Sequence, residues 1–119
     1  MELSLYIKDK LVSGKRVAIP IMTHPGIELL EKRVLDAVTN GEIHYHAIRV
    51  LNECFPQSAA CTTIMDLTVE AEAFGARLSM SPNEVPSVCG RLLTGYADVE
   101  ALQIPSVESG RMPQYLLAD

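Results

Sequence analysis

The sequence predicts an α/β fold in which helices cover parallel strands. Short apolar runs typical of buried strands recur along the chain, and helical spacing of apolar residues follows each of them. Such alternation is typical of βα units, whose parallel strands need cover on both faces. With 119 residues, 48% of them apolar, the chain can hold only a few strands. It is therefore either a compact three-layer domain or the opening portion of a barrel.

The elements are expected in a simple order. A leading helix over residues 1–13 ends at Ser13-Gly14, where glycine favours a helix stop. A first βα unit then covers about 16–56. Its parts are a buried strand at Arg16–Met22, helical spacing from Ile27 to Val38, and a clearer helical face from Ile43 to Cys54.

A second βα unit is expected over about 60–102. Its strand, Ala60–Met65, is rich in β-branched residues. Thr68 is expected to cap a short helix that Gly75 closes. The remaining parts are an alternating strand at Ala76–Met80, an ambiguous segment at 85–93 and one or two helical turns near 98–102.

Composition excludes several classes of protein and site. The net charge of −5 argues against a general nucleic-acid binder. No stretch resembles a signal peptide or a membrane span, which predicts a cytoplasmic protein with no membrane partner. The three cysteines form no CxxC pair, and His44 and His46 would point to opposite sides of a solvated helix, so no metal site is expected.

Candidate functional residues follow the two expected strands, because ligands gather at the carboxyl ends of parallel strands. Met22, Thr23 and His24 lie in the first loop, where His24 could act as a general base, bind a polar substrate or merely cap a helix. Asp66 follows an apolar run directly, so it must be partnered, capping or functional. Glu70 could converge with it only if the helix begins early.

Two stretches together resemble the N-terminal part of the uroporphyrinogen decarboxylase superfamily. They are GKRVAIPIM at residues 14–22 and MDLTVEAEAFGA at residues 65–76. The second stretch looks closer to the cobalamin-dependent methyltransferase branch, in which an MTVEAEAMGA-type segment occurs. Residues 84–88 and 98–105 also look like that branch. The resemblance implies a (β/α)8 barrel, also called a TIM barrel, of which residues 1–119 would be the first third and inactive alone.

The resemblance also implies roles for the candidate residues. In the decarboxylases an aspartate at the position of Asp66 contacts the pyrrole nitrogens of the tetrapyrrole, which makes Asp66 the catalytic candidate. Thr23 stands where the decarboxylases carry an arginine for substrate carboxylates, and this departure argues against decarboxylation. Met22, Thr23, His24 and Glu70 would line the mouth where a corrinoid or tetrapyrrole docks.

The expected function is part of an enzyme that moves a methyl group from a methylcobamide to a thiol. The alternatives are a uroporphyrinogen decarboxylase and a non-catalytic small α/β binding module. Zinc and a cobamide are implied for the whole methyltransferase, with no zinc ligand on this chain, and a corrinoid protein is a further candidate partner. Open strand edges and apolar faces predict self-association of the isolated chain or a rearranged, smaller packing.

Overall fold

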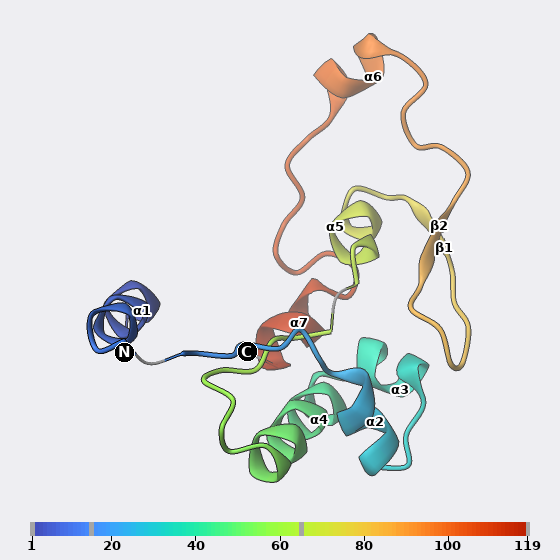
Figure 1. Ribbon diagram of the computed structural model, residues 1–119. Helices are drawn as coiled ribbons and strands as arrows, with labels where there is room; N and C mark the ends of the chain where they lie inside the picture. The colour runs from blue at the N-terminus through green and yellow to red at the C-terminus, as the bar shows by residue number, and fades with distance from the viewer. Residues whose placement is uncertain (1, 15, 65, 119) are drawn as a thin grey trace.

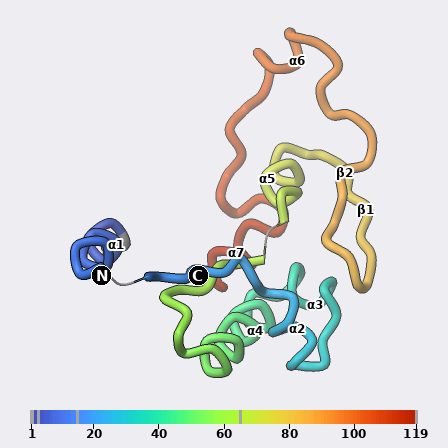
Figure 2. The backbone as a smooth tube through the Cα atoms, in the orientation of Figure 1, coloured from blue at the N-terminus to red at the C-terminus, as the bar shows by residue number. Residues whose placement is uncertain are grey.

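The computed structural model describes residues 2–14, 16–64 and 66–118. Most of its regular structure is helical, and the path of the chain can be followed in Figures 1 and 2. In chain order the elements are α1 (Leu3–Val12), α2 (His24–Leu29), α3 (Val34–Thr39), α4 (Gly41–Cys54), α5 (Thr68–Ala73), β1 (Arg77–Ser79), β2 (Ser87–Cys89), α6 (Tyr96–Ala101) and α7 (Met112–Ala118).

The core lies around α4, which packs against α2, α3 and α7. The side chains of one apolar cluster are buried here, namely Ile27, Val34, Ala37, Val38, Ala47 and Ile64. Gly26 of α2 lies so close to the main chain of Ala47 that a Cβ atom at position 26 would collide with the Ala47 carbonyl. Glycine therefore permits the close approach of α2 and α4.

The expected helical segment from Ile27 to Val38 is divided into α2 and α3. Glu31 has a φ of 54° in the turn between them, and the Lys32 amide donates to the Ile27 carbonyl at 3.1 Å. The next helix, α4, begins after Asn40, whose side chain accepts hydrogen bonds from the Glu42 and Ile43 amides at 3.0 and 3.2 Å. This N-cap explains why α4 begins directly after α3.

The segments expected as the first two strands, Arg16–Met22 and Ala60–Met65, belong to no strand among the described residues; Met65 lies outside them. They nevertheless run side by side. The Ala59 amide donates to the Ala18 carbonyl at 2.9 Å, and Thr23 Oγ1 donates to the Thr62 carbonyl at 2.9 Å. Because both bonds advance along the two segments together, the segments run in the same direction. The continuous ladder that defines a parallel strand pair is not formed between them.

The sheet that the described residues form is antiparallel. β1 pairs with β2 in the register Arg77 to Cys89 and Ser79 to Ser87. The strand expected at Ala76–Met80 is thus confirmed at its centre, and the ambiguous segment 85–93 contributes its partner. The intervening turn contains Pro82 and Asn83, which favour chain reversal.

Two helices stand away from this body. Neither α1 nor α6 packs against another helix or strand of the described chain, and Figure 1 shows both projecting from the centre. The Cα radius of gyration is 17.3 Å, whereas a compact domain of this length would have about 13.5 Å. Within the described residues, no helix combines the length and apolar character that a membrane span requires.

Candidate functional site

Asp66 lies at the centre of a buried polar network. One carboxylate oxygen, Oδ1, accepts hydrogen bonds from the amide and hydroxyl of Thr68, at 3.0 and 2.6 Å. The other, Oδ2, accepts from Arg111 Nη1 at 2.6 Å and from the Tyr115 hydroxyl at 2.9 Å. These four donors all belong to the chain itself, and they satisfy a carboxylate side chain that is 0% exposed.

Arg111 joins three parts of the fold through its guanidinium. Besides Asp66, it reaches Glu72 of α5, whose Oε2 accepts from Nε at 2.7 Å. Its Nη1 also donates to the Val38 carbonyl at 3.3 Å, near the end of α3. The planar fork of arginine suits several acceptors at once, which lysine could not match. Arg111 thereby ties the segment before α7 to α3 and α5.

Burial and charge act against each other at this site. Burial alone would raise the pKa of Asp66, but hydrogen bonds from Thr68 and Arg111 outweigh it and hold the pKa below its ordinary value. Burial would likewise lower the pKa of Arg111, and the Asp66 carboxylate outweighs it. Burial, followed by the Asp66 charge, raises the pKa of Tyr115 well above that of a free phenol. Tyr115 therefore keeps its proton and remains a donor.

Asp66 is partnered at the start of α5, although the N-cap residue of this helix is Leu67, and the expected cap by Thr68 is wrong. Thr68 is the first residue of α5, and its amide is the one that the Asp66 carboxylate accepts. A carboxylate two residues before a helical amide forms an Asx turn, which satisfies a donor that the helix leaves free. Asp66 therefore starts α5 and also binds Arg111.

A cavity of about 280 Å³ opens beside this network, between α5 and α7. Asp66 and Tyr115 form part of its wall, and the exposed side chain of Glu70 lies at its edge. Asp66 and Glu70 therefore both line this cavity, although α5 begins at Thr68 and not at Asp66, so the early helix start on which their convergence was expected to depend is absent. The cavity is lined by Thr63, Ile64, Asp66, Leu67, Val69, Glu70, Met112, Tyr115 and Leu116.

The first-loop candidates are not part of this cavity. Thr23 is buried and donates its hydroxyl hydrogen to the Thr62 carbonyl, so it joins the two extended segments. His24 is exposed at the first position of α2, and Met22 is half-buried. None of the three belongs to the cavity lining between α5 and α7. The structure therefore brings together Asp66 and Glu70 but places the first loop elsewhere.

The sequence did not reveal Arg111, Tyr115 or His44. His44 was expected on a solvated helix, but it is 0% exposed, and its Nε2 accepts from the Ile64 amide at 2.8 Å. Its ring meets that of Tyr115 edge to face, with centroids 5.2 Å apart. One signal was available for Arg111, because it is the only lysine or arginine after Arg91. An isolated cation needs a carboxylate partner when it is buried.

The described residues do not make a metal site. No group of three or more His, Cys, Asp or Glu side chains among them is placed to hold an ion. Cys54 and Cys89 are exposed and Cys61 is half-buried, each as a free thiol. Two polar side chains at the cavity can contact a bound molecule: the exposed Glu70 carboxylate, which is an acceptor, and the protonated Tyr115 phenol.

Comparison with known proteins gives a fold relationship. No protein-family profile and no curated protein sequence matches the chain. A solved structure of a methyltransferase from Methanosarcina mazei superposes with a TM-score of 0.67 at 24% identity, over 92% of this chain. The chain spans only 34% of that methyltransferase. It therefore has the fold of about one third of a methyltransferase.

Proposed function

We propose that this chain is part of a (β/α)8-barrel methyltransferase of the cobalamin-dependent kind. The observation that carries the proposal is the superposition of nearly the whole chain on one third of a methyltransferase. The MDLTVEAEAFGA stretch adds to it, because its residues start and form α5 beside the cavity. The methyl group would pass from a methylcobamide to a thiol, as the sequence resemblance implies.

Methyl transfer is favoured over decarboxylation by the environment of two residues. Thr23, which replaces the carboxylate-binding arginine of the decarboxylases, is occupied with the Thr62 carbonyl. Asp66, the counterpart of the pyrrole-binding aspartate, has both oxygens engaged by donors of this chain. A decarboxylase substrate is a tetrapyrrole with eight carboxylates. Neither Thr23 nor Asp66 offers the free side-chain group that would bind it.

The described residues do not fit zinc or a whole cobamide by themselves. Within them no three metal-ligand side chains converge. The cavity of about 280 Å³ lies just below the range of about 300–1,000 Å³ for pockets that hold drug-sized ligands, and a cobamide is larger still. Residues outside this chain would therefore supply the metal ligands and most of the cofactor site.

The part that we assign to this chain is one wall of the site. Asp66 holds Tyr115 and the start of α5 in place, through the hydrogen bonds at 2.9 and 3.0 Å. Glu70, which is exposed at the cavity edge, is free to approach a bound molecule. In this arrangement Asp66 is a positioning residue, and Glu70 is the carboxylate that contacts the substrate or cofactor.

A gene-level observation and an assay test the proposal. The reading frame is expected to continue past residue 119 with the remaining strands and a His-x-Cys pair followed by a later cysteine. A stop codon at that point contradicts the proposal. The polypeptide extended by those residues, called the long polypeptide below, is assayed after loading with zinc. It is expected to convert methylcobalamin and a thiol to a thioether, cob(I)alamin and a proton, and the loss of the methylcobalamin absorbance measures the reaction.

Variants of the long polypeptide test the assigned residues. Glu70→Gln should lower kcat/KM by at least about tenfold if its carboxylate contacts the bound molecule. Glu53→Gln is a matched control, because Glu53 is an exposed carboxylate on α4 that pairs with Arg49. Equal activity in the Glu70 variant and the wild type would remove Glu70 from the site.

A further inference from the structure

A small polar cavity lies at the end of the sheet where β1 begins and β2 ends. Its volume is about 210 Å³, and its lining includes Arg77, Cys89 and Arg91 together with two glycines, Gly75 and Gly90. Arg77 faces Cys89 across the strand pair, and Arg91 follows Cys89 by two residues. Antiparallel pairing therefore brings two arginines, 14 positions apart in the sequence, to one cavity.

The two glycines keep this cavity open. Gly75 and Gly90 have φ values of 96° and 76°, which favour glycine over other residues. Beyond the neighbouring residues, no atom lies within 4 Å of the place that a Cβ atom would take at either glycine. The volume is below the range of about 300–1,000 Å³ for pockets that hold drug-sized molecules. The cavity therefore suits a small ion or a single chemical group of a larger molecule.

The charge at the cavity is positive. Arg77 and Arg91 are exposed, and neither takes part in an ion pair within the described parts of the chain. No aspartate or glutamate of these parts belongs to the lining. Arg91 also lines an apolar cavity beside α5, so its aliphatic stem can rest on that surface while its guanidinium turns toward Arg77.

The acidic side chains of the neighbouring elements lie elsewhere. Glu84 is in the turn at the opposite end of the sheet. On α5, Glu72 is held by Arg111, and Glu70 lines the cavity between α5 and α7. The acidic residues of α6 belong to a helix that packs against no other described element. The described fold therefore leaves both arginines available to an external anion.

The cavity also lies away from the place where further barrel strands would pair. Such strands would be added beside the extended segments 16–22 and 60–64. Both β1 and β2 contact α5, and Figure 1 shows the sheet on the far side of α5 from these segments. Completion of the proposed barrel at the extended segments therefore leaves this end of the sheet open.

We propose that this cavity binds the phosphate group of a small molecule between Arg77 and Arg91. Each planar guanidinium can donate two parallel hydrogen bonds to phosphate oxygens, which a lysine could not do. A phosphate monoester carries a charge of about −1.5 to −2 at neutral pH, which two arginines balance. This inference is independent of the proposed methyl transfer, and either could fail alone.

Isothermal titration calorimetry with inorganic phosphate tests the site. The protein to titrate is the polypeptide that the complete reading frame encodes, whatever its length. At pH 7 and low ionic strength we expect saturable binding with a dissociation constant on the order of 1 mM, because charged hydrogen bonds to two exposed arginines give a modest affinity. Acetate, with a single charge, should bind at least about tenfold more weakly. Absence of saturable phosphate binding, or equal binding of acetate, would overturn the proposal.

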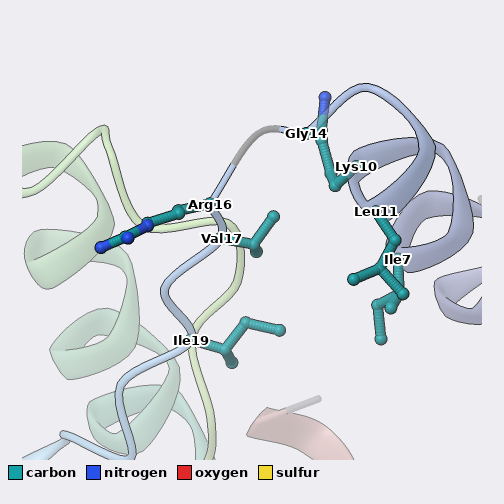
Figure 3. A pocket seen from close by; sticks show the side chains of 7 residues that line it. All are labelled: Ile7, Lys10, Leu11, Gly14, Arg16, Val17 and Ile19. Atoms are coloured by element: carbon teal, nitrogen blue, oxygen red, sulfur yellow. The ribbon is translucent and has the colours of Figure 1, made fainter.

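Substitutions assign the binding to the two arginines. Arg77→Gln and Arg91→Gln should each raise the dissociation constant of phosphate by at least about tenfold. Arg16→Gln is the matched control, because Arg16 is also exposed and without an ion pair in the described parts. Figure 3 shows Arg16 on the extended segment after α1, directed away from Ile7 and Leu11. Affinities that are equal in all three variants contradict the assignment.

The thiol of Cys89 gives a second, local measurement. Cys89 and Cys54 are both exposed free thiols, but Cys89 lines the cavity and Cys54 is the last residue of α4. Saturating phosphate should slow alkylation of Cys89 by iodoacetamide at least about threefold, because the bound ion limits access to the thiol. Alkylation of Cys54 should not change. Peptide mass spectrometry measures both rates, and an unprotected Cys89 would mean that phosphate binds elsewhere.

Discussion

The part of the chain around α4 and the two projecting helices, α1 and α6, differ in how many partners each element has. α4 is held by α2, α3 and α7, with the Asp66–Arg111 pair linking α7 to α5 and α3. α1 and α6 have no packed neighbour among the described elements, and their largest apolar side chains are exposed. Local helix signals are thus present in both regions, but only one region has the tertiary contacts that fix its helices.

The largest effect is expected where the packed region depends on a buried charge. Arg111→Met removes a cation that is 7% exposed and leaves the Asp66 carboxylate buried without its ion-pair partner. Breaking one side of a buried ion pair costs about 3–5 kcal/mol. The free energy of unfolding, measured by urea denaturation at pH 7, should fall by this amount.

Arg49→Met is the control for the loss of an arginine. Arg49 pairs with Glu53 at 2.9 Å, but both side chains are 59% exposed, and such helical surface pairs contribute about 0.3–0.5 kcal/mol. If the two variants lose the same unfolding free energy, the buried Asp66 network contributes no more to stability than a surface ion pair.

Glycine-to-alanine substitutions should lower the unfolding free energy in the packed region but not at the projecting helix α6. In Gly26→Ala the new methyl group would overlap the Ala47 carbonyl and push α2 away from α4. Overpacking of this kind costs about 1–3 kcal/mol. Gly95→Ala, at the start of α6, meets no atom within 4 Å and should change the unfolding free energy by less than about 0.5 kcal/mol. Thermal unfolding of the two variants measures the difference, and a reversed order would contradict the close approach of α2 and α4.

Acid should weaken the packed region through Asp66. Because the pKa of Asp66 is lower in the folded chain than in the unfolded one, its contribution is fully present above the unfolded pKa and is lost as pH falls through the folded pKa. We expect a partial loss of stability between neutral pH and about pH 3, smaller than that caused by Arg111→Met. Urea titrations across this range measure it.

Asp66→Asn serves as the comparison for the acid titration, since the amide cannot titrate. Its unfolding free energy should depend less steeply on pH than that of the wild type. Asp36 contributes to both curves, because its hydrogen bonds with Arg33 lower the pKa of Asp36 to about 2. Parallel curves for variant and wild type would assign the acid sensitivity to Asp36 and other surface carboxylates.

The sequence predicted elements better than it predicted their partners. α4 follows from the spacing of Ile43, Ala47 and Leu51, and the break at Gly75 ends α5. These are local signals, so they can be read from neighbouring residues. The first two expected strands are absent from the described residues. A strand exists only when another segment completes its hydrogen-bond ladder, and no local pattern in the sequence records that partner.

Only the local part of the site could be predicted from the sequence, because the partners of its residues lie far away along the chain. The position of Asp66 after an apolar run indicated a partnered carboxylate, and the structure supplies the partner 45 residues later. The choice of Arg111 depends on how α7 packs, and the burial of His44 depends on Ile64 and Tyr115. Such pairings join distant positions of the chain and leave no periodic trace in the sequence.

The smallest effect is expected in the loop after α6. Ile104 is 94% exposed, so Ile104→Ser removes almost no buried apolar area and should change the unfolding free energy by less than about 0.5 kcal/mol. Ile27→Ser, in the core between α2 and α4, is the contrasting substitution, because Ile27 is 2% exposed. Urea denaturation of both variants measures the contrast directly. A loss above 1 kcal/mol for Ile104→Ser would mean that this loop is covered in solution, and that the difference between the packed and projecting regions does not describe the free chain.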